Sequence, residues 1–111
     1  VYYNALREGG MVNIGDPGID GVVWDEWNLD HIVKHGVSRA EVEEVIDLGP
    51  VFQQAYKGRA LAIGPTQSGR VLAVVLGPVP DQPGTFYVFS ARPASRKERR
   101  HFQTLRGDGQ R

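Results

Sequence analysis

The chain has 111 residues, a length that matches one ordinary domain. A hydrophobic content of 41%, which includes 2 Trp, 4 Tyr and 4 Phe, argues against a disordered chain. The sequence has no cysteine, which excludes disulfides and cysteine-ligated metal sites. No apolar run approaches the roughly 18 residues of a membrane span, so we expect a cytoplasmic domain without a membrane partner.

The net charge of zero conceals a segregation of charge along the chain. Residues 1–50 carry ten acidic and three basic residues, a net charge of −7, and residues 51–111 carry ten basic and three acidic residues, a net charge of +7. Most bases of the second half are arginine, whose planar guanidinium suits bidentate phosphate contacts. This pattern favours a C-terminal half that holds a phosphate backbone, most simply that of RNA. The alternative is a structural domain whose two charged halves pair with each other.

The first predicted elements follow a lead-in at residues 1–21, where Gly-Gly and Asp-Pro-Gly sequences are typical of a flexible segment. A short strand at residues 22–24 precedes a helix that is bounded by Asp25 as the N-cap and Gly36 as the terminator. The helical spacing of its apolar residues predicts a buried stripe of Leu29, Ile32 and Val33.

A second helix is predicted to begin at once, because Ser38-Arg39-Ala40-Glu41 is a capping box, and to stop at Gly49-Pro50. Strand-like runs follow at residues 51–56, 59–64, 70–76 and 85–92, and their connections are too short for helical crossovers. We therefore expect an antiparallel sheet with helices covering it. A last helix begins with the capping box Ser95–Glu98, and residues 106–111 form a flexible tail. The predicted order, β-α-α-β-β-β-β-α over residues 22–105, is an α+β domain.

Three arginines stand at strand ends beside turns: Arg59, Arg70 and Arg92. We expect them to gather on one face, where they would offer fixed donors to phosphate oxygens, although any one of them has a structural alternative. His31 and His35 have the i, i+4 spacing of a metal pair, but no third ligand accompanies them. We therefore interpret these two as surface histidines and expect neither metal nor cofactor.

Several motifs of the chain occur together and in a recognisable order. They are W-D-x-x-N from Trp24, K-H-G-V-S from Lys34, the runs Arg59–Gly64 and Gly69–Leu72, and A-R-x-A-S-x-x-E-R-R from Ala91. With these motifs, residues 22–104 resemble the BrnT family, toxins of type II toxin–antitoxin pairs with a RelE-like fold. The resemblance implies metal-independent RNA cleavage that inhibits translation. It also implies RNA and a ribbon-helix-helix antitoxin as partners, and it is compatible with a homo-oligomer.

The resemblance, together with the charge pattern, yields two sets of candidate residues. The catalytic candidates are His35, Arg59, Arg70, Arg92 and Glu98. The candidates for RNA binding are Lys34, Arg96, Arg99, Arg100 and His101.

Two side chains compete for the role of general base. His35 is favoured because an imidazole titrates near neutrality, whereas Glu98 has a structural alternative as a capping-box partner. The family often has tyrosine at the position of Phe102, and His101 beside it is a candidate substitute. A function from another class also stays open, a non-catalytic module that binds RNA or protein on a degenerate toxin fold.

Overall fold

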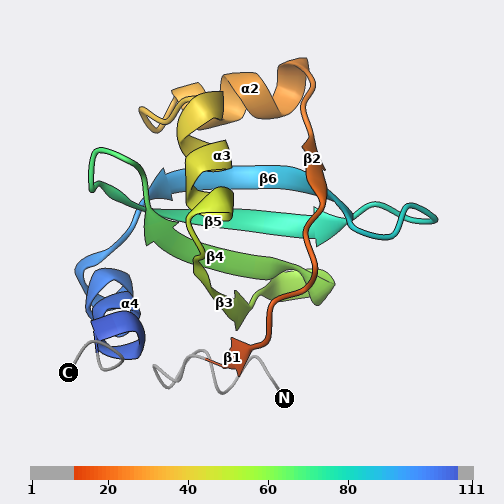
Figure 1. Cartoon of the computed structure of the whole chain (residues 1–111). Helices are drawn as coiled ribbons and strands as arrows, with labels where there is room; N and C mark the ends of the chain where they lie inside the picture. The colour runs from red at the N-terminus through yellow and green to blue at the C-terminus, as the bar shows by residue number, and fades with distance from the viewer. Residues whose placement is uncertain (1–11, 108–111) are drawn as a thin grey trace.

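A six-stranded sheet forms the centre of the computed structural model, which describes residues 12–107 (Figure 1). The elements are β1 (Asn13–Ile14), β2 (Gly21–Val23), α2 (Glu26–Val33), α3 (Arg39–Asp47), β3 (Val51–Gln54), the 3₁₀ turn η1 (Tyr56–Gly58), β4 (Ala60–Pro65), β5 (Val71–Pro78), β6 (Thr85–Pro93) and α4 (Arg96–Gly107). This arrangement confirms the predicted α+β class. No helix in this part of the chain is long and apolar enough to cross a membrane.

The strand order is β1-β3-β4-β5-β6-β2. The run from β3 to β6 is antiparallel, as the short connections predicted. The prediction of a wholly antiparallel sheet was wrong at one edge, because β2 pairs with β6 in parallel. Short turns forced the other strand pairs to be antiparallel, but β2 and β6 are separated by residues 24–84 and can therefore pair in parallel.

The predicted flexible lead-in also needs a correction. Asn13 and Ile14 form β1 and pair with Gln53 and Phe52 of β3, and Gly21 already belongs to β2. Residues 1–11 of the lead-in and residues 108–111 of the tail lie outside the described residues, so the division into a domain and two flexible ends stays a prediction.

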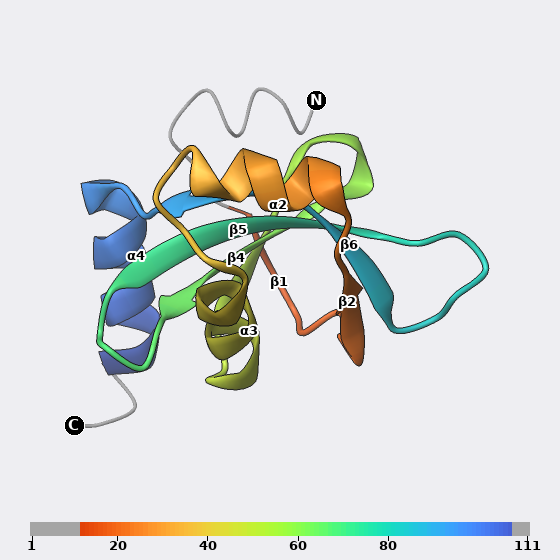
Figure 2. The ribbon, with the colours of Figure 1, turned by 90° about the horizontal axis from the view of Figure 1, so that it is seen from above.

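Both predicted helix starts in the first half are confirmed. Asp25 caps α2 in a capping box with Asn28, and Ser38 caps α3 in a capping box with Glu41. The predicted inward position of Val33 was wrong, because 66% of this residue is exposed while Ile32 is fully buried. Helix α2 lies beside β6 (Figure 1 and Figure 2), and its buried residues are Asn28 and Ile32, on one side of the helix.

Two hydrophobic clusters lie on opposite faces of the sheet. The larger one packs under α2 and α3 and contains Ile32 and Val45. The smaller one contains Ile63 and Ala73 and packs against Phe102 of α4. Helix α4 covers one end of this second face, and no other helix of the described residues 12–107 packs on it. We call the rest of this face the open face and define it by Leu61, Val75, Phe89 and Arg92.

A β-bulge in β6 decides which side chains reach the open face. Val75 of β5 pairs with Ser90 and Leu76 pairs with Val88, so Phe89 is an extra residue in β6. Both Val88 and Ala91 are buried in the cluster under the helices, three residues apart rather than two. A bulge shifts the alternation of side chains by one residue. Arg92 therefore lies on the open face instead of in the hydrophobic cluster under the helices.

Candidate functional site

A cavity of about 280 Å³ lies on the open face. Leu61 and Val75 give it apolar walls, and the guanidinium-bearing side chains of Arg59 and Arg92 line it as well. The remaining lining residues are Gln54, Ala55 and Tyr56. A second hollow, of about 290 Å³ beside β1, has Asp16 and no basic side chain in its lining. Of these two hollows, the cavity of the open face is the one suited to an anionic ligand.

Arg92 is held in place by Glu98 at the start of α4. Its Nη1 and Nη2 donate to the two carboxylate oxygens of Glu98, at 2.7 and 2.9 Å. Glu98 also accepts from the backbone N–H of Ser95, and its own N–H donates to the Ser95 hydroxyl, which confirms the predicted capping box. The pKa of Arg92 is raised, chiefly by the hydrogen bond to Glu98.

Glu98 is itself buried, which works to raise its pKa, but the hydrogen bonds from Arg92 and Ser95 outweigh the burial and lower that pKa below its usual value. A carboxylate held in this way is a weak proton acceptor near neutral pH. The geometry therefore suits Glu98 for holding Arg92 better than for acting as a general base.

Arg59 lies over an aromatic ring on the same face. Its Cζ is 3.6 Å from the centroid of the Phe89 ring, a cation–π contact. Gly77 of β5 makes room for this pair, since a Cβ at Gly77 would lie 2.7 Å from the Phe89 ring and 3.4 Å from Arg59 Cγ. The bulge at Phe89 and the absence of a side chain at Gly77, the register partner of Tyr87, together place the Arg59 guanidinium.

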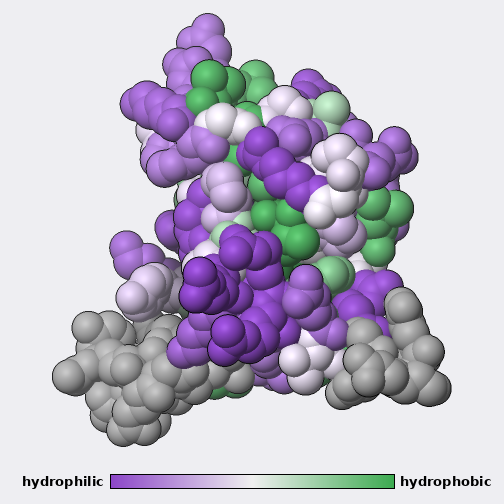
Figure 3. Space-filling view, turned by 90° about the vertical axis from the view of Figure 1, so that its left-hand side faces the viewer, coloured by the Kyte–Doolittle hydropathy of each residue, from purple (hydrophilic) through white to green (hydrophobic). Residues whose placement is uncertain are grey.

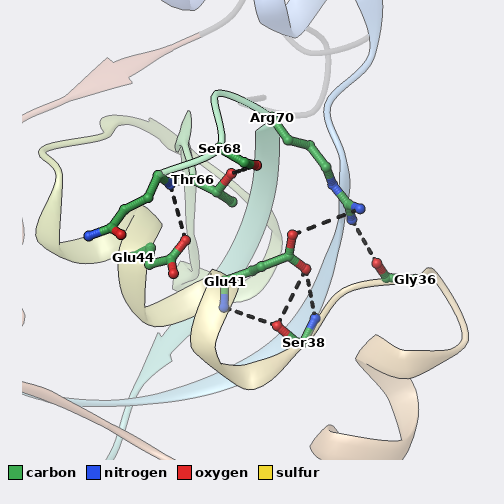
Figure 4. Close-up of polar contacts among 8 residues, drawn as sticks. Gly36, Ser38, Glu41, Glu44, Thr66, Ser68 and Arg70 are labelled. Atoms are coloured by element: carbon green, nitrogen blue, oxygen red, sulfur yellow. Dashed lines mark hydrogen bonds and ion pairs between the residues drawn. The ribbon is translucent and has the colours of Figure 1, made fainter.

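Arg70 does not join the other two arginines, so the expected gathering of all three was wrong. It lies in the β4–β5 connection, where Nη2 donates to the carbonyl of Gly36 at 2.8 Å and Nη1 is 3.9 Å from Glu41 (Figure 4). Its Nε is buried and has no hydrogen-bond partner within residues 12–107. Arg70 therefore ties the β4–β5 connection to the α2–α3 corner, away from the residues that line the cavity.

The histidine and lysine candidates of the first half lie at the same corner. Lys34 and His35 follow α2 and are exposed, and the His35 ring packs edge-on against His31 at 5.6 Å. Neither residue lines the cavity. The structure thus separates the predicted base, His35, from the cavity that Arg59 and Arg92 share.

The candidates on α4 lie beyond Glu98. Arg96 and Arg100 are exposed, whereas Arg99 donates to the carbonyl of Ala94 and His101 is hydrogen-bonded to Asn13 of β1. Figure 3 shows the end of the molecule where α4 lies, with strongly hydrophilic side chains gathered over its lower part. This end presents a hydrophilic, arginine-bearing surface beside the open face.

Three residues of this site were not predicted from the sequence: Tyr56, Gly77 and Phe89. Tyr56 lines the cavity from η1, where Lys57 adopts a positive φ of 58°. A glycine inside a strand often marks a bulge or a close approach, but the strand run was predicted to end at residue 76, and β5 in fact continues through Gly77 to Pro78. Nothing in the local pattern distinguished Phe89 from the other β-formers around it.

Comparisons with known proteins bear on the fold. No protein-family model matches the chain, and no curated protein matches it. Among solved structures, the crystal structure of the Brucella abortus ribonuclease toxin BrnT matches with a TM-score of 0.55 and 29% sequence identity. The match covers 97% of that chain and 68% of this one. The resemblance inferred from the motifs is therefore confirmed at the level of the fold, and this chain has a BrnT-like toxin fold.

Proposed function

We propose that this protein is a ribonuclease toxin that cleaves single-stranded RNA at the cavity of the open face and thereby inhibits translation in the cytoplasm. The observation that carries the proposal is the placement of Arg59 and Arg92 around one apolar-walled cavity. A volume of about 280 Å³ is at the small end of ligand pockets, which suits one nucleotide and its phosphate. The ribonuclease activity stated for the Brucella toxin supports the same assignment.

The proposed reaction needs no metal ion. The 2′-oxygen of a ribose attacks the adjacent phosphorus, the bond from phosphorus to the 5′-oxygen breaks, and the products carry a 2′,3′-cyclic phosphate and a 5′-hydroxyl. Arg59 and Arg92 would stabilise the negative charge of the pentavalent phosphorus. Among the described residues, Arg92 uses three of its five donors, two on Glu98 and one on the Pro93 carbonyl, which leaves two N–H groups for phosphate oxygens.

The 2′-hydroxyl proton must pass to a base and the 5′-oxygen must receive a proton. His35 remains the candidate from the sequence, and Tyr56 is the candidate from the geometry because its side chain lines the cavity. We expect Tyr56→Phe to lower the cleavage rate by about 10²-fold or more, and His35→Ala to lower it only if RNA draws the α2–α3 corner toward the cavity.

We further propose that a partner antitoxin neutralises the protein by covering the arginine-bearing end of α4 and the open face beside it. Exposed Arg96 and Arg100 suit an acidic segment of that partner. Reversing the charge of both arginines should weaken a complex formed with the protein that a neighbouring gene encodes. A complex of unchanged affinity would assign the antitoxin to another surface.

The test of the proposed activity is a cleavage assay with purified protein, a single-stranded RNA and a chelator present. Wild-type protein should cleave, and Arg92→Ala should lower the rate by about 10²-fold or more. Arg39→Ala is the matched control, because Arg39 pairs with Glu43 on the exposed surface of α3. The RNA with 2′-deoxy substitutions should resist cleavage.

The alternative function, RNA binding without cleavage, is favoured by one observation. Among the described residues that line the cavity there is neither an imidazole nor a carboxylate. Under this alternative the wild-type protein binds the RNA, leaves it intact, and loses affinity in Arg92→Ala.

A further inference from the structure

Five aromatic rings lie in series on the surface and lead away from Arg59. The centroid of Phe89 is 4.9 Å from that of Tyr87, and Tyr87 is 6.4 Å from Trp27. Trp27 stacks on His31 at 4.9 Å with 7° between the ring planes, and His31 meets His35 edge-on at 5.6 Å. We call these five side chains the aromatic row.

The row is built on two elements that are fixed to each other. Trp27, His31 and His35 are spaced by four residues along α2 and its C-terminal turn, so they form one column. The Tyr87 hydroxyl of β6 donates to the carboxylate of Asp25, the N-cap of α2, at 2.9 and 3.0 Å. The rings are therefore held in order before any ligand binds.

The most prominent ring of the row belongs to neither hydrophobic cluster. Trp27 is 56% exposed, although burial of an indole would stabilise the fold, and its exposed ring is already packed parallel to His31. Large exposed aromatic side chains that adjoin a cationic site are typical of proteins that stack with nucleobases. Packing of the cores does not account for this ring.

We propose that the aromatic row stacks with unpaired bases of the single-stranded RNA whose backbone is held at Arg59 and Arg92. The proposal rests on the proposed function and extends it to a second part of the substrate. The row joins the cavity through Phe89, whose ring the Arg59 guanidinium covers at 3.6 Å. An RNA strand that extends from the cavity would thus lie next to the first rings of the aromatic row.

The charges along the row favour bases over phosphates as the contacting groups. Cationic side chains stand at its two ends, Arg59 at one and Lys34 at the other, where the backbone can be held. Between them α2 carries Glu26 and Asp30, which repel phosphates but not neutral bases. A protein partner is the competing occupant, and the continuity with the arginine-lined cavity argues for RNA.

The experiment measures binding of a non-cleavable 2′-fluoro oligouridylate and of an abasic oligomer with the same backbone. Trp27→Ala should weaken binding of the oligouridylate by about 10-fold, the effect of losing one stacked base, whereas Trp27→Phe should retain most of the affinity. Val33→Ala is the matched control, because Val33 is an exposed apolar residue of α2 outside the row. Thermal unfolding of each variant confirms that it is folded.

The abasic oligomer separates stacking from charge. Wild-type protein and Trp27→Ala should bind it equally, while Arg59→Ala should weaken binding of both oligomers. Equal affinity of wild type and Trp27→Ala for the oligouridylate would overturn the proposal, as would a loss that persists on the abasic oligomer. Unchanged RNA affinity together with a weakened antitoxin complex would assign the row to a protein partner and also overturn it. None of these outcomes depends on cleavage, so failure of the proposed ribonuclease activity is seen separately.

Discussion

Arg92 and Glu98 form a two-bond ion pair that links the end of β6 to the first turn of α4, with donor–acceptor distances of 2.7 and 2.9 Å. The same carboxylate closes the capping box of Ser95. One side chain thus both begins the helix and orients the arginine of the cavity. We propose that Glu98 is a positioning residue that acts through Arg92.

The ion pair between Arg92 and Glu98 makes the free energy of unfolding fall at acidic pH. The folded state lowers the pKa of Glu98, so its contribution is fully present above the pKa of an unfolded glutamate, about 4.3, and is lost as the pH falls through the lower, folded value. Glu98→Gln should lower the free energy of unfolding by about 1–3 kcal/mol at neutral pH. Urea unfolding should show that this difference shrinks when the pH is lowered to about 3. An equal difference at both pH values would contradict the assigned role.

Gly77→Ala tests the placement of Arg59. The new Cβ would lie 2.7 Å from the Phe89 ring, so the ring must move. The Arg59 guanidinium, which packs on this ring, must then move as well. We expect a loss of about 1–3 kcal/mol of stability and a weaker affinity for RNA, measured by thermal unfolding and by fluorescence anisotropy. Gly21→Ala is the matched control, since nothing lies within 4 Å of its Cβ position. Equal RNA affinities in the two variants would argue against a role for this contact.

Arg70→Ala should affect the fold and not the reaction. The variant loses the hydrogen bond to the Gly36 carbonyl, which contributes about 1 kcal/mol to stability. RNA affinity and cleavage rate should stay within about twofold of wild type at a temperature where the variant is folded. A fall in cleavage that exceeds the loss of folded protein would return Arg70 to the site.

The salt dependence of RNA affinity measures how many phosphates the arginines neutralise. For single-stranded RNA, the slope of log affinity against log salt falls by about 0.7 for each phosphate contact that is lost. Arg92→Ala should therefore reduce the slope by about this amount between roughly 50 and 200 mM salt, and Arg39→Ala should leave it unchanged. Identical slopes for wild type and Arg92→Ala would indicate that Arg92 does not contact a phosphate.

The features that could be predicted from the sequence are those that depend on interactions between residues close together in the chain. The capping boxes at Ser38 and Ser95 were predictable because each depends on two residues three apart. The separation of Arg70 from Arg59 was not predictable, since both precede a strand. The groups that hold Arg70 at the corner, the Gly36 carbonyl and Glu41, come from distant parts of the sequence. The β6 bulge was equally hidden, because it arises from pairing with β5 rather than from the residues around it.

The central claim is that RNA binds the open face, and a titration followed by nuclear magnetic resonance tests it most directly. Backbone amide signals of uniformly labelled protein are recorded while a non-cleavable 2′-fluoro oligoribonucleotide is added. The account predicts the largest shift changes at Tyr56, Leu61, Val75 and Arg92, the residues around the cavity, with little change at the exposed surface of α3 around Arg39. Shift changes confined to the α2–α3 corner or to α3, with the cavity residues unmoved, would contradict it.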